Sequence, residues 1–122
     1  ISKVARNKTM SSEKKVNIPA NEVYVKSGHD HVRIVIDEIS YIQSDTDYTE
    51  VHLAKSKILT SESLRNWLEI LPDDHFVRVH KSYIVNTSHI RKVSGNELHL
   101  KQDVIIPIGR AFKETFIERF IK

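Results

Sequence analysis

The stretch FVRVHKSYIVN, residues 76–86, begins as a half-buried strand and then breaks its own pattern. Val77 and Val79 alternate with Arg78 and His80, so these valines share one face of a strand and the basic residues share the other. Period-two counting would place Lys81 on the valine face, where its ammonium group would be buried without a partner. Ser82 and a second apolar run follow. The regular strand therefore ends near Lys81, and basic side chains gather at that end.

The composition of the 122-residue chain is that of one globular domain. The absence of cysteine excludes disulfides and cysteine-based metal sites, and it favours a cytoplasmic location. No apolar run approaches the roughly 18 residues needed to span a bilayer, so no membrane partner is expected. The first residue is Ile rather than Met, and we therefore expect the chain to be part of a longer one.

Charge is distributed unevenly along the chain, whose formal net charge is +3. Residues 1–17 carry +4, residues 18–73 carry −5 and residues 74–122 carry +4. A basic tail and a basic C-terminal part around an acidic middle suit a polyanionic partner. Proteins without such a partner can show the same imbalance, so charge alone leaves both interpretations open.

Short alternating segments dominate the chain from residue 22 onward and predict a mainly β domain. The expected strands are residues 22–28, 31–37, 37–45, 46–54, 57–60, 76–82, 89–94, 96–100 and 103–108. The first two form a hairpin across the SGHD turn, and Gly95-Asn96 predicts another tight turn.

Two segments have helical spacing instead. In the first, Ser61 is the expected N-cap, Glu62 falls in the first turn and Pro72 ends the helix. Its apolar face consists of Leu64, Trp67, Leu68 and Leu71. The second helix covers residues 109–122, and its apolar stripe consists of Phe112, Phe116, Ile117 and Phe120.

No pattern in the sequence predicts catalysis. There is no glycine-rich phosphate loop, no G-x-S-x-G elbow and no H-E-x-x-H helix. His29 and His31 form one H-x-H pair, but no third ligand stands at a suitable spacing, and surface hairpin histidines explain them better. We therefore expect a protein that is not an enzyme and that has no cofactor and no metal site.

Binding is better supported, because polar or basic side chains gather at element ends in three places: residues 48–50, residues 78–82, and Arg110 with Lys113. Arg110 stands in the first turn of the second helix, where the helix dipole mildly disfavours a cation. Such a placement suggests a residue kept for a partner, although a solvated arginine at a helix start is an alternative.

Three segments, in this order, resemble the LytTR (LytR/AlgR-type) DNA-binding domain of bacterial response regulators. They are ISYIQSDTDYTEVHL (39–53), TSESLRNWLEILPDDHFVRVHKSYIVNTSHIRKVSGNELHL (60–100) and IPIGRAFKETF (106–116). The resemblance covers roughly residues 22–121. It implies a mainly β fold of about ten short strands in stacked small sheets with two short helices.

The resemblance also implies a function: the sequence-specific DNA-binding output domain of a two-component transcriptional regulator. Domains of this family insert loops into successive major grooves of double-stranded DNA at direct-repeat sites, usually as two copies. Residues 22–122 would be this domain. Residues 1–21 would be a linker that could include the end of a preceding receiver domain, which takes part in a phosphorelay.

The family's base-contacting positions transfer to this chain residue by residue, and neighbouring polar residues are our candidates for contacts to the DNA backbone. Base-contacting candidates are Thr49, Lys81 and Arg110, and DNA backbone-contacting candidates are Arg78, His80, Ser82, Lys113 and Glu50. Arg78 and His80 could instead be structural hydrogen-bonders beneath the interface. Phosphate repels Glu50 unless this residue orients a Lys or Arg or accepts from a cytosine amino group. The family's frequent Ser before Arg110 is Gly109 here, and Gln43 replaces a usual Glu.

A second hypothesis is a β-rich module that recruits a protein or peptide along an exposed edge strand such as residues 31–37. Salt dependence separates the two, because contacts to several phosphates weaken steeply as salt rises and edge-strand pairing does not. A small hydrolase is a third class, which the missing catalytic constellation disfavours.

Overall fold

The computed structural model describes residues 2–3, 5–6 and 21–121. The expected linker at residues 1–21 therefore lies largely outside the described residues, apart from the short parallel pair β1 (Ser2–Lys3) and β2 (Ala5–Arg6). From residue 22 onward the structure has ten strands and two α-helices, which confirms the mainly β prediction.

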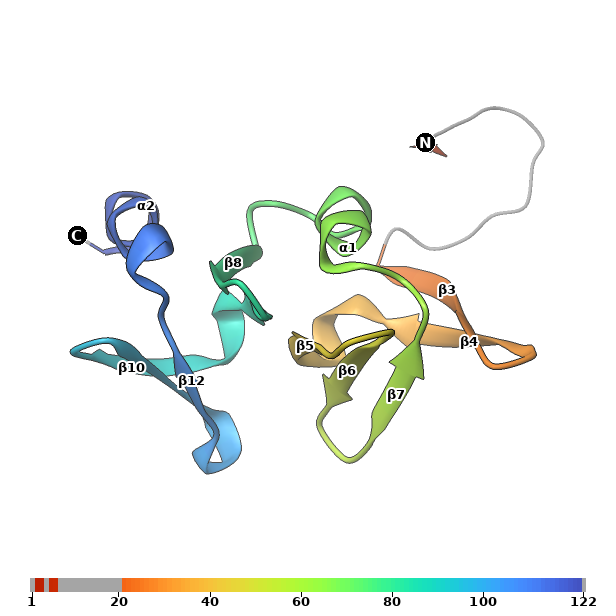
Figure 1. Ribbon diagram of the computed structural model, residues 1–122, viewed down its shortest axis with the longest axis horizontal. Coiled ribbons are helices and arrows are strands. Elements are labelled where there is room, and N and C mark those ends of the chain that lie inside the picture. Colours follow the sequence, from red (N-terminus) through yellow and green to blue (C-terminus); the bar gives the residue numbers. More distant parts are fainter. Residues whose placement is uncertain (1, 4, 7–20, 122) are drawn as a thin grey trace.

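Three small antiparallel sheets are stacked along the long axis of the molecule (Figure 1). The first contains β3 (Glu22–Ser27) and β4 (Asp30–Val35). The central sheet has the order β7-β6-β5-β9-β8 and consists of β5 (Ile39–Ser44), β6 (Thr49–Leu53), β7 (Lys57–Thr60), β8 (Phe76–His80) and β9 (Tyr83–Asn86). The third contains β10 (Ile90–Ser94), β11 (Glu97–Leu100) and β12 (Ile105–Pro107).

Two α-helices and three single 3-10 turns complete the fold from residue 21 onward. The helices α1 (Leu64–Ile70) and α2 (Arg110–Phe120) lie on the same side of the stack (Figure 1). The 3-10 turns are η1 (Ile36–Glu38), η2 (Thr87–His89) and η3 (Lys101–Asp103). The tight turn predicted at Gly95-Asn96 is present, and Gly95 has a φ of +60°, a conformation that glycine adopts without steric cost.

The central sheet is buried on both faces at β5, β8 and β9, because these three strands supply side chains to two separate cores. Strands β6 and β7 pack only against the N-terminal core, and Leu59 on their other face is 45% exposed. The N-terminal core also takes residues from the first sheet and α1, and the C-terminal core takes residues from the third sheet and α2. Central-sheet members of the N-terminal core are Ile39, Ile42, Val51, Phe76 and Ile84. Central-sheet members of the C-terminal core are Val77, Val79 and Val85, with Tyr41 and Tyr83 packed against it.

The start of the first helix differs from the prediction. Its N-cap is Ser63 rather than Ser61, because the Ser63 hydroxyl accepts the backbone N–H of Asn66 at 3.1 Å. Glu62 therefore precedes the helix and does not lie in its first turn. The helix ends before Pro72, as predicted, and Trp67 is fully buried in the N-terminal core.

The second helix packs through aromatic residues spaced four apart. Phe116 is buried, and Phe112 and Phe120 are half-buried beside it. The prediction that Ile117 belongs to this stripe is wrong, because its side chain is 40% exposed. A step of one residue turns the helix by about 100°, which takes Ile117 off the face that Phe116 buries.

Replacing Trp67 with alanine removes the largest fully buried side chain. We expect Trp67→Ala to lower the free energy of unfolding by roughly 3–5 kcal/mol, since the neighbouring core cannot fully close the cavity. Chemical denaturation measures the change. Glu69→Ala, on an exposed position of the same helix, should stay within about 0.5 kcal/mol of the wild type. Equal effects of the two substitutions would contradict the core assignment.

Candidate nucleic-acid interface

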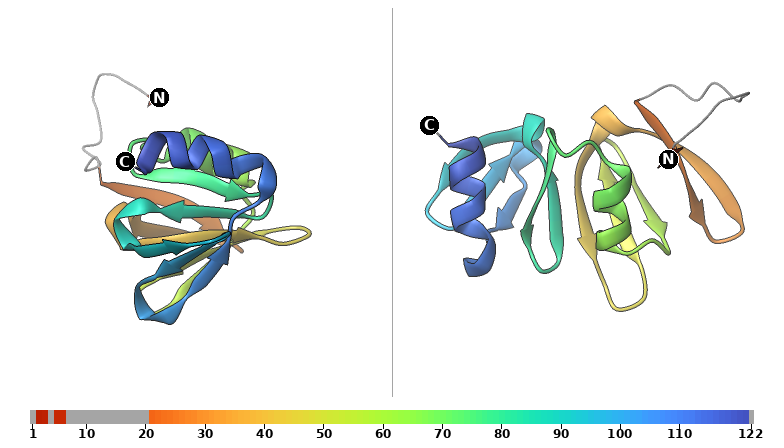
Figure 2. Two further views of the ribbon diagram at one scale, coloured as in Figure 1. Left: turned by 90° about the vertical axis from the view of Figure 1, so that its left-hand side faces the viewer. Right: turned by 90° about the horizontal axis from the view of Figure 1, so that it is seen from above.

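Three connecting segments meet at one end of the strands of the central sheet. Strand pairing places them there: Ser44 is opposite Thr49, Thr49 is opposite Thr60, and Gln43 is opposite Tyr83. The β5–β6 loop (45–48), the β7–α1 link (61–63) and the β8–β9 turn (81–82) are therefore neighbours. Together with the N-terminus of α2 we call them the loop edge, and Figure 2 shows the loop and the turn projecting on the same side as the start of α2.

The start of α2 is attached to the β8–β9 hairpin through Gly109. Its backbone N–H donates to the carbonyl of Val79 at 2.6 Å. A Cβ at Gly109 would lie 3.5 Å from His80 Cα and 3.1 Å from Phe112 Cδ2, so a larger residue would have to displace the Phe112 ring. Glycine thus permits close contact here, and the next residue, Arg110, is exposed beside the turn.

Two of the basic residues in the opening stretch hold the β8–β9 turn in place. Arg78 donates through Nη2 to the carbonyl of Lys81 at 2.6 Å and through Nε to the carbonyl of His80 at 3.3 Å. His80 Nδ1 accepts the backbone N–H of Ser82 at 3.1 Å. The Arg78 guanidinium also lies 5.8 Å from the centre of the Phe112 ring. Both side chains therefore have the structural hydrogen-bonding role that was one of their two expected roles.

The other expected contact residues of this region lie at the loop edge or beside it. Lys81 is exposed at the tip of the turn, and the Ser82 carbonyl accepts the backbone N–H of Ser44 at 2.8 Å, which ties the turn to β5. Lys113 is half-buried on α2 and donates to Asn96 Oδ1 at 2.6 Å. Lys81 and Arg110 are thus the two exposed cations among the expected contacts.

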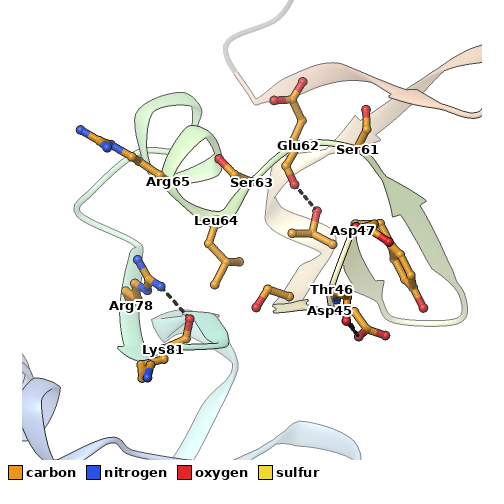
Figure 3. A pocket seen from close by; sticks show the side chains of 13 residues that line it. Asp45, Thr46, Asp47, Ser61, Glu62, Ser63, Leu64, Arg65, Arg78 and Lys81 are labelled. Carbon is orange, nitrogen blue, oxygen red and sulfur yellow. Dashed lines mark hydrogen bonds between the residues drawn. The ribbon is translucent and has the colours of Figure 1, made fainter.

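Thr49 does not lie on the surface: its side chain is 2% exposed. Its hydroxyl lies 2.7 Å from Thr60 Oγ1, donates to the carbonyl of Glu62 at 2.9 Å (Figure 3) and accepts the indole N–H of Trp67 at 3.1 Å. A base contact from Thr49 would require this network to open, so we do not propose one. Alternation along β6 places Thr49 on the same side as buried Val51, and this pattern was visible in the sequence.

Glu50 lies on the opposite face of β6 from Thr49, where other groups engage its carboxylate. Its Oε1 is 3.1 Å from His52 Nε2 and 3.7 Å from Lys57 Nζ. The His52 ring stacks on Tyr41 with 4.1 Å between ring centres. Burial lowers the pKa of His52, and the hydrogen bond to Glu50 acts in the opposite direction. The carboxylate of Glu50 is therefore held on the sheet by His52 and lies within ion-pair distance of the exposed Lys57.

A cleft of about 540 Å³ separates the β5–β6 loop from the β8–β9 turn (Figure 3). Its charged lining residues are the basic Arg65, Arg78 and Lys81 and the acidic Asp45, Asp47 and Glu62. Hydrogen bonds from the Thr46 backbone N–H and the Tyr48 hydroxyl lower the pKa of Asp45, so its carboxylate stays charged at neutral pH.

Arg65 was not among the residues expected from the sequence. It is the second residue of α1, a position as unfavourable for a cation as that of Arg110. Placing the N-cap at Ser61 hid this, because it moved Arg65 two residues deeper into the helix. The correct cap at Ser63 is the feature that would have drawn attention to it.

The fold and the loop edge define a mainly β binding module that has no recognition helix of the helix-turn-helix kind in residues 21–121. Residues 29–121 match the family model described as the LytTr DNA-binding domain. The chain belongs to this family.

Two relatives with a curated description are similar to part of this chain. The chain is 34% identical over 73 residues to the transcriptional regulatory protein LytR of Staphylococcus aureus (strain N315), a match that covers 56% of this chain and 30% of that protein. It is 28% identical over 86 residues to the sensory transduction protein LytT of Bacillus subtilis (strain 168), covering 65% of this chain and 36% of that protein. The matches thus span about a third of the length of these relatives.

A solved LytTr DNA-binding domain from Bacillus cereus has the same fold. The TM-score is 0.72 at 21% sequence identity, and the match covers 81% of this chain and 95% of the other. Within residues 2–3, 5–6 and 21–121, no helix is long and apolar enough to cross a membrane.

Replacing Thr49 with valine tests whether its hydroxyl is structural. Valine keeps the volume but leaves the Trp67 indole N–H without its partner inside the core. We expect Thr49→Val to lower the free energy of unfolding by about 1–3 kcal/mol and to change the tryptophan fluorescence. Thr49→Ser, which keeps the hydroxyl, should restore most of both. Normal stability of Thr49→Val together with lost DNA binding would instead place Thr49 in contact with DNA.

Proposed function

We propose that this chain is a sequence-specific DNA-binding output domain of a bacterial transcription regulator and that it binds DNA through the loop edge. The observation that carries the proposal is the convergence of the β5–β6 loop, the β8–β9 turn and the start of α2 at one end of a sheet whose strands β5, β8 and β9 are buried on both faces. Membership of the LytTr DNA-binding domain family supplies the partner.

The exposed cations Lys81 and Arg110 contact the bases in this proposal. Both can donate to guanine O6 and N7 in the major groove, and the planar guanidinium of Arg110 can do so with two parallel hydrogen bonds. The backbone of the β8–β9 turn, which carries Lys81, is held in place. The strands on either side of it are buried, and Arg78 donates to a carbonyl of the turn. Little conformational entropy of the backbone is therefore lost on binding.

Phosphate contacts fall to Ser82 and Lys113, which lie beside the two base-reading residues. Such contacts fix the register of the protein on the duplex and give affinity that depends on salt. Arg78 and His80 act indirectly, since their hydrogen bonds shape the turn that carries Lys81 and Ser82. Glu50 is assigned no DNA contact.

The loops enter successive grooves on one side of the duplex, and two copies of the domain bind as a homodimer on a direct repeat. In the curated relatives the matched part is about a third of a longer regulatory protein. We propose that this domain likewise acts beside an N-terminal receiver domain, in the cytoplasm, where the DNA is.

Selection of duplexes from a random pool tests the proposal as a whole. We expect enrichment of two similar half-sites in direct orientation, about one helical turn apart. Affinity should fall steeply as salt rises, because several phosphate contacts release counterions. A pool without enrichment, or binding that is independent of salt, would overturn the proposal and favour a protein or peptide partner.

Replacing Arg110 with alanine should cost roughly 1–3 kcal/mol of binding free energy at the selected site and relax the preference at one base position. Titration against duplexes varied at single positions measures both effects. Lys101→Ala is a suitable control, since η3 lies at the opposite end of β11 and β12 from the start of α2. An unchanged base preference in Arg110→Ala would remove Arg110 from the readout.

Replacing Lys113 with alanine should weaken binding to all sequences about equally. It should also reduce the slope of log affinity against log salt by about 0.9, the contribution of one neutralised phosphate. Binding titrations at several salt concentrations measure this slope. A selective loss at one base pair would show that Lys113 reads a base and does not contact phosphate.

A further inference from the structure

We infer that the cleft at the loop edge seats one sugar–phosphate strand of the bound DNA and that Arg65 is its direct phosphate contact. The inference rests on the proposed function and extends it to a residue of α1, outside the segments from which DNA contacts were expected. It is carried by the position of the cleft, by the segregation of charge on its walls and by the bonding state of its three cations.

The geometry of a duplex determines which part of the bound DNA lies over the cleft. The β5–β6 loop forms one side of the cleft, and the β8–β9 turn forms the other. Each groove of DNA is bounded by the two sugar–phosphate strands, so elements that enter adjacent grooves have one strand between them. In this binding mode the β8–β9 turn enters a major groove and the β5–β6 loop lies over the adjoining minor groove, so the one strand that separates these two grooves passes over the cleft.

Most charges of opposite sign lie on opposite walls of this cleft. Arg65, Arg78 and Lys81 lie on the side of α1 and the β8–β9 turn, whereas Asp45 and Asp47 lie on the side of the β5–β6 loop (Figure 3). The third acidic lining residue, Glu62, lies on the β7–α1 link, and its carboxylate accepts from Asn66 Nδ2 at 3.0 Å. A phosphate group is attracted to the first wall and repelled by the second. The strand therefore lies against the basic wall, and the loop carboxylates limit how far it can shift across the cleft.

Bonding within the basic wall distinguishes Arg65 from its neighbours. The Arg78 guanidinium already donates to two backbone carbonyls, and Lys81 extends from the turn toward a groove in the proposed binding mode. Arg65 is exposed, and among the side chains that the structure describes it forms no hydrogen bond or ion pair. Its guanidinium can therefore present two N–H groups to one phosphate without breaking an existing contact.

Substitution of Arg65 in the full 122-residue chain tests the inference, with a duplex selected by the wild type as the probe. We expect Arg65→Gln to weaken binding to this duplex and to an unrelated duplex alike, by roughly three- to tenfold. The salt slope should fall by about 0.9 and the base preference should stay unchanged. Arg65→Lys, which keeps the charge, should recover most of the salt slope.

Lys55→Gln is the matched control. It removes the same charge from the β6–β7 turn, at the end of β6 opposite the loop edge, where Lys55 is also exposed. We expect it to bind both duplexes with nearly wild-type affinity and slope. Equal behaviour of Arg65→Gln and Lys55→Gln would overturn the inference, because Arg65 would then act only through the overall charge of the chain.

A second measurement locates the phosphate. Uncharged methylphosphonate replaces single phosphates along the duplex, and the replacement on the strand between the two contacted grooves should weaken wild-type binding. In Arg65→Gln the same replacement should have no further effect, because the contact is already lost. Additive losses at that position, or a changed base preference in Arg65→Gln, would overturn the inference while wild-type sequence selectivity keeps the proposed function intact. A wild type that selects no duplex would overturn both.

Discussion

The double burial of the central sheet is the constraint on which the rest of the structure depends. Neighbouring residues of β8 point into different cores: Phe76 joins the N-terminal core and Val77 joins the C-terminal core. Ile84 and Val85 of β9 divide in the same way, so β9 is apolar on both faces and hydrophobic patterning alone fixes its register weakly. Specific polar contacts contribute to it. Asn86, buried in β9, donates to the carbonyl of Ile39 at 2.9 Å, and the Thr49 hydroxyl joins β6 to β7 and α1.

This constraint makes the edge of the sheet a suitable place for contacts with a large rigid ligand. The turn that carries Lys81 continues strands that are packed on both sides, and Gly109 brings the start of α2 against the same hairpin. The cations divide into two groups. Arg78 donates its hydrogen bonds to backbone carbonyls of the turn, whereas the side chains of Lys81 and Arg110 are exposed. A preorganised surface of this kind keeps the entropic cost of binding low.

Periodicity predicted the strands, the helices and the apolar faces well, because each reflects which side of an element is buried. The fate of individual polar groups was harder to predict, since it depends on partners that are distant in sequence. Arg78 and Lys81 carry the same charge three residues apart. Only the fold shows that the Arg78 guanidinium donates to the backbone carbonyl of Lys81. Ser61 and Ser63 were equally good N-caps by residue type. Choosing Ser61 placed Arg65 deeper in the helix, so its unfavourable position near the helix N-terminus was not recognised. The kind of partner came from family resemblance, because charge distribution left that question open.

The acidic groups at the loop edge are a cost to affinity, and their presence there needs a physical reason. A surface of cations alone would bind any duplex, and the many non-specific sites of a genome would then compete with the target. Carboxylates beside the cleft penalise phosphates that approach in the wrong position, so opposing charge can contribute specificity as well as attraction. Asp45 fits this role, because its hydrogen bond with the Thr46 backbone N–H at 2.7 Å keeps it charged and fixed in direction. In the proposed binding mode, discrimination between DNA sequences arises from repulsion at the β5–β6 loop together with donation from Lys81 and Arg110.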